Sequence, residues 1–222
     1  MLSNVSFSFG QSESSKNDVA LEIENDTVKK KVQVIEEVVV ISNRVKRTGS
    51  VTKTGISIKD LPQSVQEIGN EVITQQQAVR LSDVVKNVNG VYVSSARGGA
   101  QESFYGRGYD LSANNMFKNG FRFNSGSIPE VSSLEKVEVL KGSAALLFGN
   151  VSPGGILNMV TKMPSFKSGG EVAMQMGSYS FYKPSIDFYG PLNNSIAYRF
   201  IGSYENSESF RDVVKKERYY IN

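Results

Sequence analysis

Apolar and polar residues alternate one by one along three stretches near the carboxyl end of the chain. These stretches are Glu171–Met176, Tyr182–Phe188 and Ile196–Tyr204. A period of two residues places apolar side chains on one face of a β-strand and polar side chains on the other, so each stretch is predicted to be a strand. A fourth strand is predicted at Glu217–Asn222. The same alternation fits a soluble antiparallel sheet and the wall of a membrane barrel, and periodicity alone does not separate the two.

The connections between these strands are predicted to differ in length. Gly190–Asn194 reads GPLNN and should make a tight turn, whereas Asn206–Lys216 is longer and polar. Short turns at one end of the strands and longer loops at the other are typical of transmembrane β-barrels.

The middle of the chain carries a helical period instead. Apolar residues recur at i, i+3, i+4 and i+7, which predicts one buried face of a short helix: Leu81, Val84, Val85 and Val88. Asn89 and Gly90 then provide a stop signal, and Val91–Ser94 is predicted to be a strand. Short helices that alternate with short strands indicate an α+β domain before the carboxyl-terminal strands.

The stretch Leu134–Lys162 reads LEKVEVLKGSAALLFGNVSPGGILNMVTK and combines a charged strand with a short helix, a glycine turn and a second strand. Valines alternate with charged residues in its first part, which predicts one apolar and one charged face. Ser143 can cap a short helix at Ala144–Phe148, and Pro153-Gly154-Gly155 favours a turn before the strand Ile156–Thr161. The charged face of such a strand requires a polar or charged neighbour instead of an apolar core.

Composition narrows the function. The 222 residues contain 25 basic and 22 acidic residues, so the net charge of +3 gives no global field for nucleic acid. Cysteine and histidine are absent, which excludes disulfides, thiol nucleophiles, zinc clusters and histidine triads. No nucleophile and base pair is recognisable, so an enzyme is not expected. A metal handled by this chain should therefore arrive already chelated. The sequence contains no run of about 18 apolar residues, so no membrane-spanning helix is predicted.

Residues 1–48 are predicted to precede the folded part. Residues 1–10 resemble the tail of a secretory signal peptide, although an ordinary terminus fits almost as well. The polar segment from Gln11 to Lys31 is predicted to be a tether. A short β-prone run follows at Glu36–Ser42, EEVVVIS, which by itself could be an edge strand.

Several ordered motifs resemble the plug domain of TonB-dependent outer-membrane receptors, and most closely that of ferric-siderophore receptors. They are LPQSVQEIG at 61–69, LSDVVKNVNGVYV at 81–93, YGRGYD at 105–110, FKNGFR at 117–122 and the stretch Leu134–Lys162. Any one of these motifs alone would be weak, but their order and spacing together are specific. The resemblance implies an α+β plug domain with a short mixed sheet and short helices at residues 49–165. The first antiparallel strands of a transmembrane β-barrel would follow at residues 166–222, with the barrel incomplete here.

The resemblance also implies active import. A ferric siderophore would be the ligand and would carry the iron, so no cofactor is expected. The energy-transducing protein TonB would be the periplasmic partner, outer-membrane lipid would surround a monomeric barrel, and the plug would lie inside that barrel in the outer membrane of a Gram-negative cell. Alternatives are another cargo on the same scaffold, such as cobalamin or an oligosaccharide, and a secreted β-rich adhesion or structural protein.

Three sets of site residues are implied by the resemblance. The run Glu36–Ser42 matches the TonB box, which joins the partner by strand addition, and comprises Glu36, Glu37, Val38, Val39, Val40, Ile41 and Ser42. Contacts between plug and barrel are expected from Arg107, Glu135, Glu138 and Lys141. Ligand contacts are expected on apical loops of the plug, from Arg97, Tyr109, Asn114, Asn115 and Phe123. Each of these side chains also has a plain structural reading as a solvated charge or a packing residue.

Overall fold

The computed structural model describes residues 4–7, 64–97, 101–123, 126, 128–142 and 148–222. All of them belong to one structural unit. The predicted TonB box at 36–42, the tether before it and residues 144–147 of the predicted helix lie outside the described residues. Among the helices that are described, none is long and apolar enough to cross a membrane.

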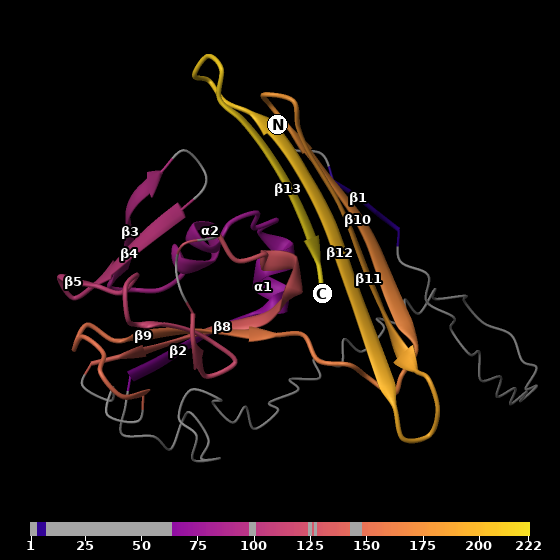
Figure 1. The fold of residues 1–222 in the computed structure, drawn as a ribbon, viewed down its shortest axis with the longest axis horizontal. Helices are drawn as coiled ribbons and strands as arrows, with labels where there is room; N and C mark the ends of the chain where they lie inside the picture. Colours follow the sequence, from indigo (N-terminus) through magenta and orange to yellow (C-terminus); the bar gives the residue numbers. More distant parts are fainter. Residues whose placement is uncertain (1–3, 8–63, 98–100, 124–125, 127, 143–147) are drawn as a thin grey trace, which may run out of the picture. The chain divides into compact units, whose positions relative to one another are not determined.

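A mixed five-stranded sheet forms the base of the α+β domain, by which we mean residues 64–162 (Figure 1). Its strand order is β2-β8-β9-β6-β7, with bounds Ser64–Gly69, Leu134–Lys141, Ile156–Thr161, Met116–Lys118 and Phe121–Arg122. The pair β6 and β9 is parallel and the other neighbours are antiparallel. The expected short mixed sheet is confirmed, and the two strands of the Leu134–Lys162 stretch are direct neighbours in it.

The described part of this domain also contains three short helices and a second, three-stranded sheet. The helices are α1 (Asn70–Gln75), α2 (Leu81–Val85) and the 3₁₀-helix η3 (Val131–Ser133). The sheet has the order β3-β4-β5, with bounds Val91–Arg97, Gln101–Gly106 and Tyr109–Asp110. Both of its strand pairs are antiparallel.

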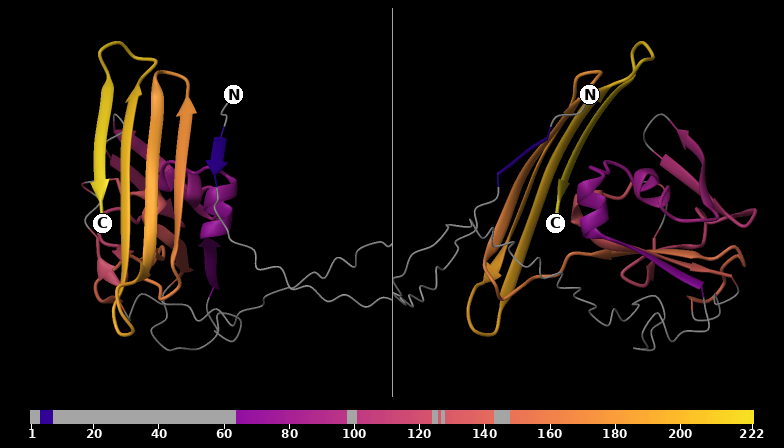
Figure 2. Two further views of the ribbon diagram at one scale, coloured as in Figure 1. Left: turned by 90° about the vertical axis from the view of Figure 1, so that its right-hand side faces the viewer. Right: turned by 180° about the vertical axis from the view of Figure 1, so that it is seen from behind.

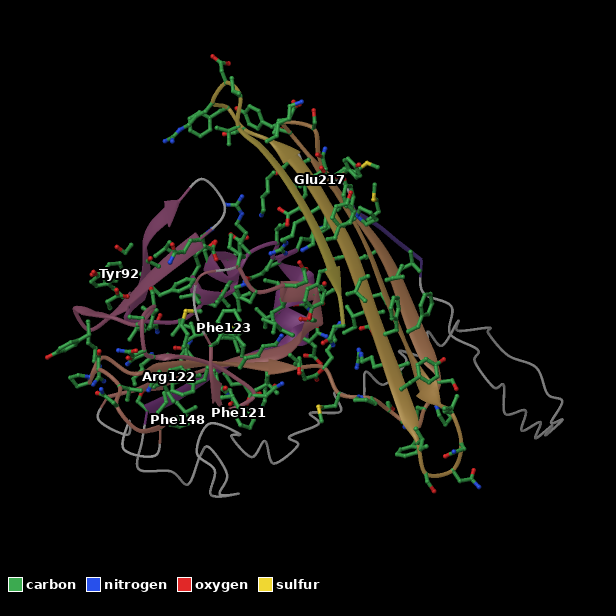
Figure 3. All side chains as sticks on the ribbon, in the orientation of Figure 1. Tyr92, Phe121, Arg122, Phe123, Phe148 and Glu217 are labelled. Carbon is green, nitrogen blue, oxygen red and sulfur yellow. The ribbon has the colours of Figure 1, made fainter. Side chains whose placement is uncertain are left out.

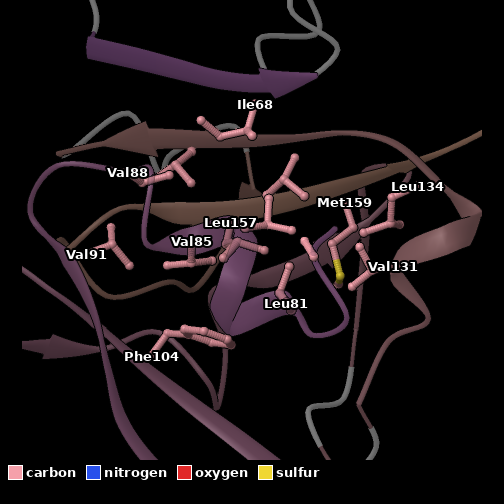
Figure 4. Close-up of a cluster of buried hydrophobic side chains, with 14 of the residues drawn as sticks. Ile68, Leu81, Val85, Val88, Val91, Phe104, Val131, Leu134, Leu157 and Met159 are labelled. Carbon is pink, nitrogen blue, oxygen red and sulfur yellow. The ribbon is translucent and has the colours of Figure 1, made fainter. Parts of the chain in front are cut away.

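The core of the α+β domain lies between α2 and the mixed sheet (Figure 4). The four residues of the predicted apolar stripe are all buried: Leu81, Val84, Val85 and Val88. They pack with Phe104 from β4 and Leu157 from β9, which are both almost fully inaccessible to solvent. A helix as short as α2 gains its stability from this packing rather than from its own backbone hydrogen bonds. The periodicity therefore located core positions correctly.

The carboxyl-terminal sheet consists of four long antiparallel strands, and Figure 2 shows them as a continuous twisted layer. The strands are β10 (Gly169–Gly177), β11 (Phe181–Pro191), β12 (Ala197–Glu208) and β13 (Lys215–Ile221). A short strand β1 (Asn4–Phe7) pairs antiparallel with β10 at the edge of the sheet. The antiparallel arrangement expected from the alternation is confirmed.

The connection between β12 and β13 is shorter than the sequence indicates. β12 and β13 stay paired through Glu208 and Lys215, so the predicted polar loop 206–216 is reduced to 209–214. Polar residues extend the ladder here because they form cross-strand pairs, such as Glu208 with Lys215 at 3.3 Å. Composition alone marked them as loop residues, since it does not detect such pairing.

The two faces of the carboxyl-terminal sheet differ as the alternation predicts. One face presents exposed apolar side chains, among them Phe188, Tyr198 and Phe200. On the other face charged side chains alternate with them and are largely buried, including Lys183 and Asp187. A buried charge is stable only with a partner, so this face must meet matching groups.

Candidate functional site

Tyrosines line the three-stranded sheet of the α+β domain. Tyr92 on β3 and Tyr105 on β4 are cross-strand partners, and their rings stack with centroids 5.8 Å apart and an interplanar angle of 28°. Tyr92 is labelled in Figure 3. It is 55% exposed, and Tyr109 on β5 is 48% exposed. Exposed aromatic faces of this kind can stack on a flat aromatic ligand or on a cation.

Three of the five predicted ligand residues are exposed or lie at the margin of the core: Tyr109, Asn114 and Phe123. Arg97 ends β3, where its backbone pairs with Gln101. Tyr109 belongs to the exposed tyrosine set, and Asn114 accepts a hydrogen bond from the Arg122 guanidinium at 3.2 Å. Phe123 packs partly buried against the core (Figure 3). Their role in ligand binding stays a prediction.

Asn115 is placed differently from its expected position on an apical surface. Its side chain is fully buried, and its amide donates to the carbonyl oxygens of Ser152 and Gly155. Its Oδ1 accepts from the backbone N–H of Ser152 at 3.0 Å. Because all three bonds go to the turn after residue 150, Asn115 braces that turn, and the ligand contact expected of it does not fit this burial.

The charged strand β8 pairs its charges inside the α+β domain. Glu138 is fully buried, and its carboxylate lies 2.8 Å from the Lys136 ammonium and 3.2 Å from the Asn158 amide nitrogen. Lys136 also contacts Glu67 on the neighbouring strand at 3.0 Å. The expectation that Glu138 contacts a barrel wall is therefore wrong in this structure. The domain itself supplies the neighbour that a charged strand requires.

Lys136 lies between two carboxylates that face each other across β2 and β8. Glu67 and Glu138 are direct cross-strand partners, an arrangement that is unfavourable for like charges. Burial lowers the pKa of Lys136, but its hydrogen bonds to Glu138 and Glu67 outweigh this effect and raise the pKa above its ordinary value. The ammonium thus stays charged and joins the two strands.

The other three predicted plug–barrel residues are more accessible. Glu135 is exposed, and Lys141 is half-buried with its ammonium 3.0 Å from Gln66 Oε1. Arg107 is exposed and has a positive φ of 51° in the turn between β4 and β5. Their contacts with a barrel stay a prediction.

A carboxylate that the sequence did not single out joins the α+β domain to the carboxyl-terminal sheet. Glu130, only 3% exposed, lies 2.6 Å from the ammonium of Lys183 on β11 and also contacts the guanidinium of Arg218 on β13. Arg218 additionally donates to the Ile128 carbonyl oxygen at 3.0 Å. No motif marked Glu130, since a lone acidic residue in a loop usually lies in water.

A second ion-pair group lies where the chain leaves the α+β domain. Asp187 on β11 accepts two hydrogen bonds from Arg199, at 2.8 and 2.6 Å, and lies 3.0 Å from the Lys162 ammonium. Arg199 also donates to the Met163 carbonyl oxygen at 3.0 Å. The buried charges on the inner face of the sheet thus meet partners both within the sheet and in the α+β domain.

Acidification should weaken the contact made by Glu130. Burial would raise its pKa, but Lys183 and Arg218 outweigh burial and hold the pKa below its ordinary value. The ionised carboxylate therefore contributes stability above about pH 4.5 that is lost as pH falls through the lowered native pKa. We expect wild-type protein to unfold at higher urea concentration than Glu130→Gln at pH 6, and this difference to shrink at pH 3. An equal difference at both pH values would contradict the expected linkage.

A cavity of about 90 Å³ lies between α1 and the carboxyl-terminal sheet. Its lining includes Ile73 and Gln77 from α1 and Ala173 and Ser185 from the strands. Ligand pockets usually measure about 300–1,000 Å³, so this space is too small for a metal chelate. Within the described part of the chain, no three acidic side chains gather closely enough to hold a bare metal ion.

Comparison with known proteins places these features in a family. Residues 57–156 match the model of the TonB-dependent receptor plug domain. The chain is 31% identical over 189 residues to the metal-pseudopaline receptor CntO of Pseudomonas aeruginosa, which covers 80% of this chain and 26% of the receptor. It is 30% identical to the catecholate siderophore receptor Fiu of Escherichia coli, over 73% of this chain and 22% of Fiu.

Solved structures agree with these relatives. The open form of the ferric-catecholate import receptor Fiu from E. coli superposes with a TM-score of 0.69 at 29% identity, over 77% of this chain and 25% of Fiu. The siderophore receptor PiuA from Acinetobacter baumannii gives 0.67 at 26% identity, over 74% of this chain and 24% of PiuA. The chain spans about a quarter of the length of the curated relatives it matches. It belongs to the TonB-dependent receptor family, and its α+β domain is the plug domain of that family.

Proposed function

We propose that this chain is part of an outer-membrane receptor that imports ferric siderophores with energy delivered by TonB. The proposal rests mainly on the ligands for which the relatives are named. Their names describe receptors for metal-pseudopaline, catecholate siderophores and ferrioxamine B. These ligands differ in their chelating groups, yet each is named for a metal chelate or a siderophore, so the class of cargo is better supported than any single compound.

The plug domain supports a binding role rather than catalysis. The exposed Tyr92 and Tyr109 offer aromatic surface for a ligand that carries flat rings or a cation. Arg97 is the last residue of β3 in the same sheet, and a guanidinium is the kind of group that binds an anionic chelate. The iron would remain on its siderophore, and the protein would need no cofactor. Binding energy can drive import only if the ligand contacts differ between the resting and the engaged plug.

The amino-terminal segment would couple this binding to energy. Glu36–Ser42 would join TonB as an added strand in the periplasm, where backbone hydrogen bonds supply affinity with little demand on side chains. The carboxyl-terminal sheet, with one apolar face and one charged face, would form part of a monomeric barrel whose apolar face meets outer-membrane lipid. The plug domain would lie inside that barrel.

Growth under iron limitation tests the proposal. The complete reading frame that contains this chain is expressed in a host lacking its own siderophore receptors, and ferric catecholates, ferric hydroxamates and a metallophore are supplied singly. We expect growth with at least one chelate and none without the gene. Growth with no chelate would reject the proposal, and rescue of a cobalamin- or oligosaccharide-dependent host instead would identify one of the alternative cargoes.

A further inference from the structure

The Glu130 cluster comprises five buried or partly buried charges, Glu130, Lys183, Glu205, Lys216 and Arg218. Glu130 is the plug domain's contribution, and the other four residues come from β11, β12 and β13. Glu205 is 2% exposed and lies 2.7 Å from the Lys216 ammonium and 3.5 Å from the Arg218 guanidinium. The sheet thus presents three cations to one carboxylate, and Glu130 supplies the second negative charge.

The plug segment around Glu130 is shaped to hold this carboxylate in place. Its Oε1 accepts hydrogen bonds from the Ser132 backbone N–H at 3.2 Å and from the Ser132 hydroxyl at 2.8 Å, at the start of η3. Lys183 and Arg218 approach the same carboxylate, and Arg218 also binds the Ile128 carbonyl. Residues 128–133 are therefore attached to the sheet through both backbone and side chain.

The two ion-pair groups between plug and sheet differ in how they can separate. Lys162 lies a few residues before β10, so the chain itself keeps this lysine close to Asp187. Glu130 is 88 residues away from Arg218 along the chain, and no nearby covalent link keeps the two together. When the plug moves relative to the sheet, the contacts of Glu130 can break completely. Lys162 stays close to Asp187 because the chain connects them over a short distance.

We propose that Glu130 is the positioning residue that fixes the resting plug to the first barrel strands, and that its contacts with Lys183 and Arg218 must break before the plug can move during import. This inference rests on the proposed function for its role in import. Its polarity is opposite to that expected for Arg107 and Lys141, since here the plug supplies the anion and the sheet supplies the cations. Separation leaves the three sheet cations facing Glu205 alone, which opposes spontaneous release.

Hydrogen exchange of the full-length receptor in detergent, without any cargo, tests the attachment. Glu130→Gln keeps the shape of the side chain and its contact with Ser132 but removes the charge. We expect amides in residues 128–134 to exchange about ten- to hundredfold faster, the range that corresponds to loss of a hydrogen bond to a charged group. Exchange in β8 and β9 should not change. Glu71→Gln, on an exposed carboxylate in the first turn of α1 in the same domain, is the matched control and should exchange like wild type.

A charge exchange separates a specific pair from a general loss of stability. Glu130→Lys alone should accelerate exchange in residues 128–134, and adding Lys183→Glu should restore protection because the cluster regains its original set of charges. Equal exchange in Glu130→Gln and Glu71→Gln would overturn the inference. A double variant that stays unprotected at residues 128–134 while β8 and β9 remain protected would overturn it as well. Since no cargo is present, failure of the growth assay would count against the proposed function and leave this result intact.

Discussion

Replacing Glu138 by alanine is expected to lower the free energy of unfolding of the plug domain by about 3 kcal/mol, at the lower end of the range for breaking a buried ion pair. The variant removes the carboxylate that Lys136 and Asn158 contact at 2.8 and 3.2 Å, and it leaves space in a fully buried region. Lys136 keeps its contact with Glu67, which limits the loss. The effect is measured by urea unfolding of the full chain in detergent, with susceptibility of the plug domain to proteolysis as the readout of unfolding.

Glu71→Ala is the matched control for this variant, because Glu71 is a carboxylate of the same domain, in the first turn of α1, and is exposed. We expect it to change stability by no more than about 0.5 kcal/mol, as for most surface substitutions. If the two variants were equally stable, the charges of β8 would not depend on partners inside the domain. The barrel-facing role first expected for Glu138 would then regain support.

Deleting Glu36–Ser42 from the full-length receptor is expected to abolish energy-dependent uptake while ligand binding at the cell surface persists. The segment should act by strand addition, so the backbone matters more than the side chains. Val39→Pro removes one backbone N–H and should impair uptake strongly, whereas Val39→Thr should retain most of it. Binding is measured on de-energised cells and uptake on energised cells with the same ferric chelate.

A seven-residue deletion in the polar tether, Ser14–Ala20, serves as the control because it shortens the chain equally without touching the predicted box. We expect near-normal uptake from this control. Uptake that survives the loss of residues 36–42 would reject the box assignment and leave the import proposal to other tests.

The sequence predicted the regular elements because their signals are local. The stripe of Leu81, Val84, Val85 and Val88 became core, and the alternation in β10, β11 and β12 became a two-faced sheet. The resemblance of the Leu134–Lys162 stretch to plug domains was confirmed by the family comparison. These features repeat a periodicity or a motif, so a single chain suffices to recognise them.

Roles that depend on distant partners were less accessible. Glu138 appeared to face outward because the charged face of a strand usually meets water or another chain, but Glu67 and Asn158 from neighbouring strands enclose it. Asn115 appeared to lie on a loop surface and instead braces a turn some 40 residues away. Glu130 carried no signal at all, because its partners come from β11 and β13. Such partners become visible only when the topology is known.

Uptake of radioactive iron measures energy-dependent import of a ferric siderophore directly. Cells that express the full-length receptor receive the ferric chelate that supports growth, with and without a protonophore, and cells without the gene serve as the blank. We expect intracellular iron to accumulate only when both the receptor and an energised membrane are present, and surface binding to be unaffected by the protonophore. Accumulation at the rate of the blank, or at the same rate with the protonophore present, would contradict the proposed import.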